Sequence, residues 1–235
     1  MSRPKGTCVY CGTFDSLHMD HVPPKTIFEP HDQSNLITVP CCRRCNNSAS
    51  TDDQYFLVNI ALREGAKQKP EHERLWQKAL RTVRRKEASK FRQSITSKIK
   101  FVQQVTPTGI ILSPALSIPS DGLRVIGVVI RIVKGLYFHE TGNRLADTHR
   151  VIAYDELALL LALRNTTPGR AKDLSSIRDL IGNVQTTLRK TVGQVFAYHW
   201  ASNPADAATS MWLLDFFEGI RFFCITQLTG NNLLA

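Results

Sequence analysis

The feature that most limits what this chain can fold into is a pair of Cys-x-x-Cys motifs near its N-terminus. The first pair is Cys8 and Cys11, and the second is Cys42 and Cys45. Each pair can place two thiolates on one face of a tight turn, and two pairs complete the tetrahedral sulfur shell that zinc prefers. A segment with as few apolar runs as residues 1–50 needs such a staple in place of a core. The spacing therefore predicts one structural Zn²⁺ bound by these four cysteines.

Two further cysteines need a separate interpretation. Cys41 adjoins Cys42, so a pairing of Cys41 with Cys45 is an alternative knuckle. Neighbouring residues on an extended segment point to opposite sides, which favours Cys42 as the ligand and turns Cys41 away. Cys224 lies in an apolar run and is expected to be a small buried hydrophobic residue.

The composition is typical of a globular protein, with 43% hydrophobic and 21% charged residues. No apolar signal core follows the polar, basic N-terminus, and the longest apolar stretch, residues 122–138, is broken by Arg124, Arg131 and Lys134. We therefore expect a cytoplasmic protein without a membrane partner. In a reducing compartment, clustered cysteines indicate metal binding before disulfides.

The positive charge is concentrated in one segment. The formal net charge is +10, and residues 63–100 alone hold thirteen Lys and Arg against four Glu. A local excess of this kind is typical of a surface that contacts a phosphate backbone. The alternative is a helix whose charges only keep it solvated.

Hydrophobic periodicity predicts an α+β protein in three parts. Residues 1–50 form the zinc-stapled unit, with a strand at 36–39. Residues 51–98 form a basic helical arm, with a helix start at Thr51–Asp53 and a second helix at about 71–92.

Residues 99–235 form a separate α+β domain with antiparallel strands. We expect two strands within 101–112 and a helix at 122–138, for which a strand is the alternative. Shorter helices are expected from Tyr154 and from Ser175. Three aromatic strands between 194 and 228 complete an antiparallel meander, with a turn at Glu218-Gly219.

Between the cysteine pairs the chain reads Asp20-His21-Val22-Pro23-Pro24, followed by Asn35, and Asn46-Asn47 follows the second pair directly. Over residues 7–50 this pattern resembles the HNH endonucleases, also called ββα-metal nucleases. The resemblance implies a zinc-bound ββα-metal unit that hydrolyses DNA phosphodiester bonds, with RNA as the alternative substrate.

The resemblance also implies a role for each polar residue. His21 corresponds to the general base, which suits a side chain that titrates near neutral pH. Asp20 and Asn46 correspond to the ligands of a catalytic Mg²⁺ or Mn²⁺, with Asn47 as the alternative to Asn46. Asn35 corresponds to the residue that braces the loop around the base.

Six basic residues are candidates for contact with nucleic acid, although each could equally be solvated charge. Three lie inside the zinc-stapled unit and three in the arm: Lys25, Arg43, Arg44, Arg81, Arg84 and Arg85.

The resulting hypothesis is a metal-dependent HNH endonuclease, with a role in restriction or anti-phage defence suggested by analogy. The rival hypothesis is a non-catalytic zinc-knuckle adaptor that binds nucleic acid. A third is a nuclease that a partner protein activates. Cutting both strands would favour a homodimer, because one ββα site handles one strand at a time.

Overall fold

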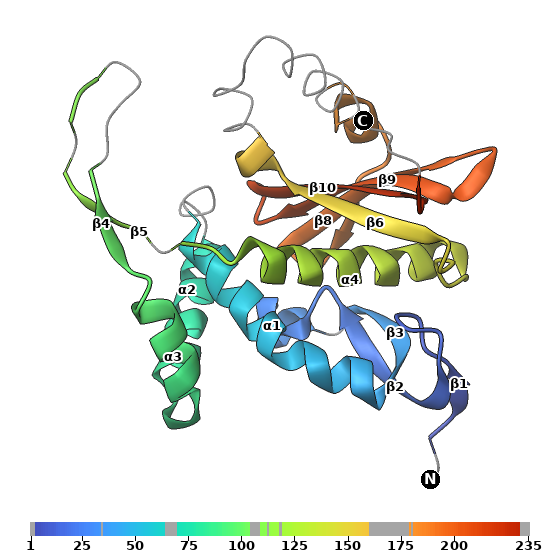
Figure 1. Ribbon diagram of the computed structural model, residues 1–235, viewed down its shortest axis with the longest axis horizontal. Coiled ribbons are helices and arrows are strands. Elements are labelled where there is room, and N and C mark those ends of the chain that lie inside the picture. Colours follow the sequence, from blue (N-terminus) through green and yellow to red (C-terminus); the bar gives the residue numbers. More distant parts are fainter. Residues whose placement is uncertain are drawn as a thin grey trace.

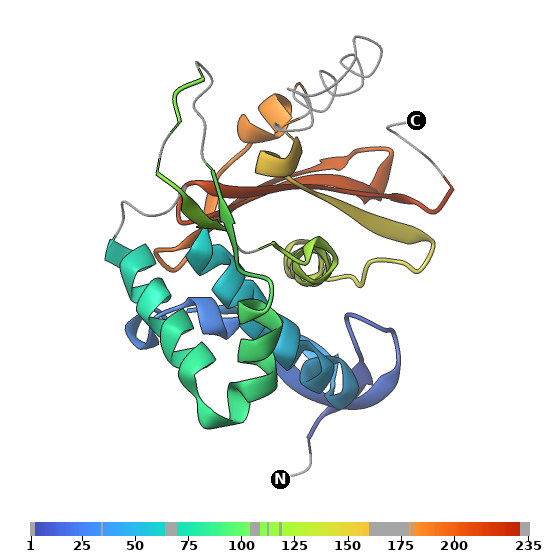
Figure 2. The same ribbon diagram turned by 60° about the vertical axis from the view of Figure 1, so that its left-hand side comes forward.

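The computed structural model describes residues 3–33, 35–63, 70–103, 109–111, 113–117, 119–159, 179 and 181–230. It is mixed α+β, as predicted, and it is layered. A five-stranded antiparallel sheet lies on one side of helix α4 (Gly122–Thr141), and the N-terminal strands with helix α1 (Arg43–Leu62) lie on the other side. Figure 2 views α4 nearly end-on, between these two layers.

The N-terminal unit is a small antiparallel sheet followed by a helix. Its strands are β1 (Lys5–Thr7), β2 (Phe14–Val22) and β3 (Ile37–Cys42), in the order β1-β2-β3. Two short 3-10 helices, η1 (Lys25–Ile27) and η2 (Pro30–Asp32), connect β2 to β3. The strand expected at 36–39 is confirmed and extends to Cys42.

Helix α1 begins directly after β3, so the expected start at Thr51–Asp53 is wrong. The side chain of Cys42 caps the helix by accepting a hydrogen bond from the Cys45 backbone N–H at 3.5 Å. The second cysteine pair is thus both a zinc knuckle and a helix start, which is why capping signals further along the chain were misleading.

The basic arm packs on α1. Helix α2 (Pro70–Arg84) buries Leu75 and Ala79. The single helix expected at 71–92 is interrupted, because the backbone of Arg85 is extended (φ −58°, ψ 143°). A 3-10 turn, η4 (Lys86–Ala88), and helix α3 (Ser89–Thr96) follow.

A thin β-hairpin projects from the body beyond α3 (Figure 1). Strand β4 (Lys100–Val102) pairs with β5 (Ala115–Ser117). The first strand expected within 101–112 is therefore found, whereas its partner lies beyond that segment, at residues 115–117. Residues 104–108 and 112 are outside the described residues.

Helix α4 confirms the helical interpretation of residues 122–138. It is capped by the Asp121 carboxylate, which accepts from the Arg124 backbone N–H at 3.4 Å, and it ends at Gly142, whose φ is +70°. The buried side chains Val125, Val129 and Leu136 lie among the seven that the helix contributes to the core.

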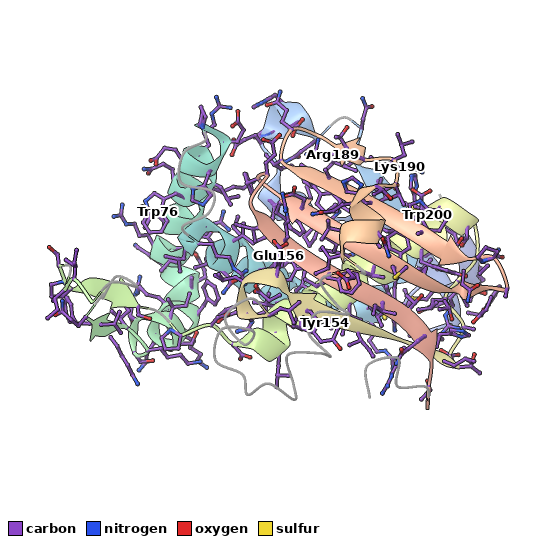
Figure 3. The ribbon with its side chains drawn as sticks, turned by 90° about the horizontal axis from the view of Figure 1, so that it is seen from above. Trp76, Tyr154, Glu156, Arg189, Lys190 and Trp200 are labelled. Carbon is purple, nitrogen blue, oxygen red and sulfur yellow. The ribbon has the colours of Figure 1, made fainter. Side chains whose placement is uncertain are left out.

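The large sheet has the order β6-β10-β9-β8-β7, with β6 (His149–Asp155), β7 (Lys190–Val192), β8 (Phe196–Asn203), β9 (Asp206–Phe216) and β10 (Ile220–Leu228). The expected meander corresponds to β8, β9 and β10, and its second turn passes through Phe217 and Glu218, both with positive φ. Figure 3 shows Arg189 and Lys190 toward the β7 edge and Tyr154 and Glu156 at the end of β6.

The two shorter helices were predicted only in part. Residues 149–155 form a strand, and residues 156–159 are helical, with the Asp155 carboxylate accepting from the backbone N–H of Leu157 at 3.1 Å. Residues 181–185 are helical, but Lys190–Val192 is strand β7. Residues 160–178 and 180 lie outside the described residues.

One buried cluster runs through all three segments, from Val22 and Phe28 through Phe56 and Val129 to Trp212. Cys224 is fully buried in it, as expected. No helix among the described residues is long and apolar enough to cross a membrane. The division at residues 50 and 98 stays a prediction.

Helix α4 packs closely against the N-terminal unit at Gly135. A Cβ placed there would lie 2.5 Å from Val22 Cγ2, whereas a Cβ at Gly127 on the same helix meets no atom within 4 Å. We expect Gly135→Ala to lower the free energy of unfolding by about 1–3 kcal/mol through overpacking. Gly127→Ala should leave it unchanged or raise it by up to about 1 kcal/mol. Urea denaturation measures both, and equal effects would contradict the packing described.

Candidate metal centre and active site

Four cysteines meet where the loop between β1 and β2 reaches the start of α1. The Sγ atoms of Cys8, Cys11, Cys42 and Cys45 all lie within 4.8 Å of one another. The Cys11 and Cys42 sulfur atoms are 3.7 Å apart. Tetrahedral zinc with Zn–S bonds of about 2.3 Å places its sulfur ligands about 3.8 Å apart. The geometry therefore fits a structural Zn²⁺, which these thiolates would hold.

Cys41 does not belong to this cluster. It lies on β3 opposite His18, is fully buried, and burial raises the pKa of its thiol to about 12.

The first knuckle is also in contact with the C-terminal half of the chain. Gly12 has a φ of +73°, and a Cβ at this position would lie 2.9 Å from the guanidinium carbon of Arg144. Arg144 forms an ion pair with Asp147, and its charge faces Cys11 and Cys8. A cation here offsets the negative charge that four thiolates bring to a zinc ion.

Asp20, the expected metal ligand, is buried on β2 with 8% of its surface exposed. Its Oδ2 accepts a hydrogen bond from the Tyr10 hydroxyl at 2.7 Å and lies 3.7 Å from Arg131 Nε. Burial raises the pKa of Tyr10 well above its ordinary value, and the Asp20 carboxylate adds to that effect. Tyr10 therefore stays protonated and donates to Asp20.

Arg131 enters this site from α4 and joins Asp20 to helix α1. Its Nη2 donates to both carboxylate oxygens of Asp53, at 2.7 and 2.9 Å. Burial alone would lower the pKa of Arg131, but Asp53 and Asp20 together raise it above its usual value. Burial raises the pKa of Asp53 to about 6, although Arg131 acts in the opposite direction.

His21 lies next to Asp20 on β2 but belongs to the other face of the strand. Asp20 and Val22 are buried while His21 is partly exposed, which is the alternation expected of a strand. Burial, and then the nearby charge of Lys25, lower the pKa of His21. Its imidazole is therefore neutral at pH 7, in the form that can accept a proton.

The remaining polar candidates lie at the start of α1 and before β3, and no recorded contact tests their roles. Asn46 lies partly exposed in the first turn of α1, and Asn47 is exposed beside it. Asn35 lies on an exposed turn two residues before β3. Their roles as metal ligand and loop brace remain predictions.

The six basic candidates are all exposed. Arg43 and Arg44 form the first turn of α1, and Lys25 begins η1 near His21. Arg81 and Arg85 border a hollow of about 360 Å³ between η1, α1 and α2, together with Thr26, Gln54 and Lys78.

Three residues of the site were missed by the motif analysis: Tyr10, Asp53 and Arg131. Tyr10 lies inside the first Cys-x-x-Cys motif. Arg131 interrupts an apolar helical stripe, and a cation in a buried stripe indicates a buried ionic partner. No spacing rule identified Asp53, which is ten residues beyond the start of α1.

Comparison with known proteins identifies the N-terminal unit. The sequence model of the HNH endonuclease family matches residues 8–52, which include both cysteine pairs, Asp20 and His21. This segment is thus an HNH-type unit, and the match supports a nuclease-type function for it. Neither the curated proteins nor the solved structures contain a match to the chain.

Neighbouring cysteines offer a matched test of the zinc centre. We expect the purified protein to hold one zinc ion per chain, Cys42→Ser to lose it, and Cys41→Ser to keep it, because only Cys42 lies in the sulfur cluster. Zinc content by plasma mass spectrometry measures this, with circular dichroism to follow folding. Zinc loss in Cys41→Ser with retention in Cys42→Ser would reverse the ligand assignment.

Proposed function

We propose that this protein is an endonuclease that hydrolyses DNA phosphodiester bonds with the help of a divalent metal ion. The observation that carries the proposal is the HNH match over residues 8–52, with Asp20 and His21 on a strand that pairs with the strand leading into the cysteine-capped helix. A role in restriction or anti-phage defence is part of the proposal by analogy alone.

His21 is proposed as the general base. Its neutral imidazole would take a proton from the water that attacks phosphorus. Its partial exposure leaves the ring open to water and substrate on the outer face of β2. Asn35, on the turn before the paired strand β3, would limit the freedom of the surrounding loop.

Asp20 and Asn46 would hold the catalytic Mg²⁺ or Mn²⁺. Both offer the oxygen donors that these hard cations prefer. The bound ion would supply positive charge to the phosphate and the leaving oxygen. In the conformation described, however, the Asp20 carboxylate is already bonded to Tyr10 and paired with Arg131, so metal binding requires that these contacts change.

The exposed Lys and Arg side chains would bind the DNA backbone and bring it close to His21. Lys25 lies near His21, and the hollow bordered by Lys78, Arg81 and Arg85 begins beside η1. Cationic side chains around a concave surface suit phosphate groups, and such contacts position nucleic acid without reading its sequence. Arg43, Arg44 and Arg84 would extend this surface.

One observation favours the second hypothesis, a zinc-knuckle adaptor that binds nucleic acid without cutting it. The carboxylate that a nuclease would use for metal serves here as part of an ion-pair network between helices. An activating partner protein that opens this network would reconcile the two hypotheses. A homodimer would be needed to cut both strands in one event.

A supercoiled-plasmid assay tests catalysis. The wild-type protein should nick or linearise plasmid with Mg²⁺ or Mn²⁺ but not with EDTA, and His21→Ala should slow cutting by about a hundredfold or more. His31→Ala, on an exposed 3-10 turn, is the matched control and should cut normally. Plasmid that is bound but not cut under every metal condition would favour the adaptor.

The proposed backbone contacts predict a salt effect. The double variant Arg81→Gln, Arg85→Gln should bind a DNA duplex more weakly and lower the slope of log affinity against log salt by about 0.9 for each lost phosphate contact. Arg189→Gln, at the far edge of the large sheet (Figure 3), is the control. Fluorescence anisotropy at several salt concentrations measures the slopes, and identical slopes would argue against this surface.

A further inference from the structure

A charged trio lies where three distant segments meet: Asp20 on β2, Asp53 on α1 and Arg131 on α4. Their side chains are only 11%, 16% and 14% exposed, respectively. One guanidinium thus faces two carboxylates in a setting where water screens the charges little, and the trio keeps a net negative charge when both carboxylates are ionised. Because one of those carboxylates is the proposed metal ligand, the cation beside it bears directly on metal binding.

The contacts of Asp20 leave little room for a hydrated ion. Its Oδ2 atom receives the Tyr10 hydroxyl at 2.7 Å and faces Arg131 Nε at 3.7 Å. Mg²⁺ keeps several of its waters when a protein carboxylate binds it, so the carboxylate must be open to solvent. With α4 docked as described, Asp20 is 8% exposed and does not meet that condition.

Arg131 contacts Asp53 more closely than Asp20, so the Asp20 contact can break while the Asp53 contact remains. Nη2 bonds both oxygens of Asp53 within 2.9 Å, whereas Nε remains 3.7 Å from Asp20. The charge-assisted hydrogen bonds from Nη2 make the Asp53 contact the stronger interaction. The Asp20 contact can therefore be lost while Arg131 remains anchored to α1 and α4 remains folded.

Solvent can also reach this position. A hollow of about 320 Å³ lies between α1 and α4, and its lining includes Tyr10, Ser48, Asp52 and Arg131. Water and small cations can therefore approach the guanidinium from this side. The contacts of Asp20 with Tyr10 and Arg131, more than its depth below the surface, therefore keep a metal ion from binding.

We propose that Arg131 is a positioning residue that controls metal binding at the candidate nuclease site. While α4 is docked, the Arg131 guanidinium forms an ion pair with the Asp20 carboxylate. A divalent cation binds Asp20 only when this ion pair has broken. This inference rests on the proposed function, because it takes Asp20 as the metal ligand. The protein described here is therefore the closed form, and an event that shifts α4 against β2 opens it.

The chain contains a close control for this idea. Arg124 lies on the same helix and donates from Nε to Asp52 of α1 at 2.8 Å. It also stacks on Tyr55, 4.3 Å from the ring centroid. Removing Arg124 costs the same unit of positive charge and a similar bridge between the same two helices, but its recorded ionic partner is Asp52 and not Asp20.

The test measures binding of Mn²⁺ alone to the full chain, from the electron paramagnetic resonance signal of the free ion. Arg131→Met should bind Mn²⁺ about tenfold more tightly than the wild type or Arg124→Met, because the competing ion pair is gone. Adding Asp20→Asn to Arg131→Met should remove the gain. Equal affinities in Arg131→Met and Arg124→Met would overturn the proposal.

A second variant tests the proposal in case Arg131→Met fails to fold. Arg131→Lys keeps the charge but lacks the separate Nη2 and Nε groups that face Asp53 and Asp20 at the same time, so its Mn²⁺ affinity should lie between those of the wild type and Arg131→Met. An affinity at or below the wild-type value would count against the proposal.

Plasmid cutting by the same variants separates this proposal from the nuclease assignment. Tighter Mn²⁺ binding through Asp20 without any cutting would support control by Arg131 and refute catalysis. Metal-dependent cutting that Arg131→Met leaves unchanged, with unchanged Mn²⁺ affinity, would support catalysis and refute control.

Discussion

The structure depends on a single helix that is covered on two sides. Helix α4 packs against β6 and β10 of the large sheet with one face and against β2, β3 and α1 with another. Its Val, Ile and Leu side chains pack against both layers, so separating either layer from the helix would expose apolar surface to water. The C-terminal half of the chain thus shares one buried core with the HNH-type unit, whose small strands offer little apolar surface of their own.

The sulfur cluster controls local geometry in the same way. Cys42 ends β3, caps α1 and belongs to the predicted zinc shell, so one residue determines where the strand stops and the helix begins. The direction of α1 follows from that point, and it brings Asp53 beside Arg131 ten residues later. A zinc ion held by these cysteines would thus help to position the candidate active site, because it would anchor the helix that carries Asp53.

Much of this could be predicted from the sequence because local signals were strong. The cysteine spacing indicated the four-sulfur cluster, a long apolar stripe indicated α4, and alternating aromatic residues indicated β8, β9 and β10. The errors arose at positions where contacts between distant parts of the chain determine the local structure. The start of α1 depends on a thiol cap, and β5 forms where β4 offers a partner and not where propensity placed it. The Asp20–Arg131 contact joins residues more than a hundred positions apart, and one sequence contains no periodic signal for such a pair.

The chemistry of that pair bears on why it is ionic. Burying a guanidinium with two carboxylates is costly, and well-packed apolar side chains of similar size generally stabilise an interface at least as well. An interface built only for stability would have little use for Arg131, Asp20 and Asp53 at this buried position. Ionic contacts have a property that apolar ones lack, because a competing ion can replace one partner. In the proposed mechanism Asp20 binds the metal ion, and Arg131 holds that carboxylate from a helix that packs against two layers. Metal binding and the packing of α4 would therefore be coupled.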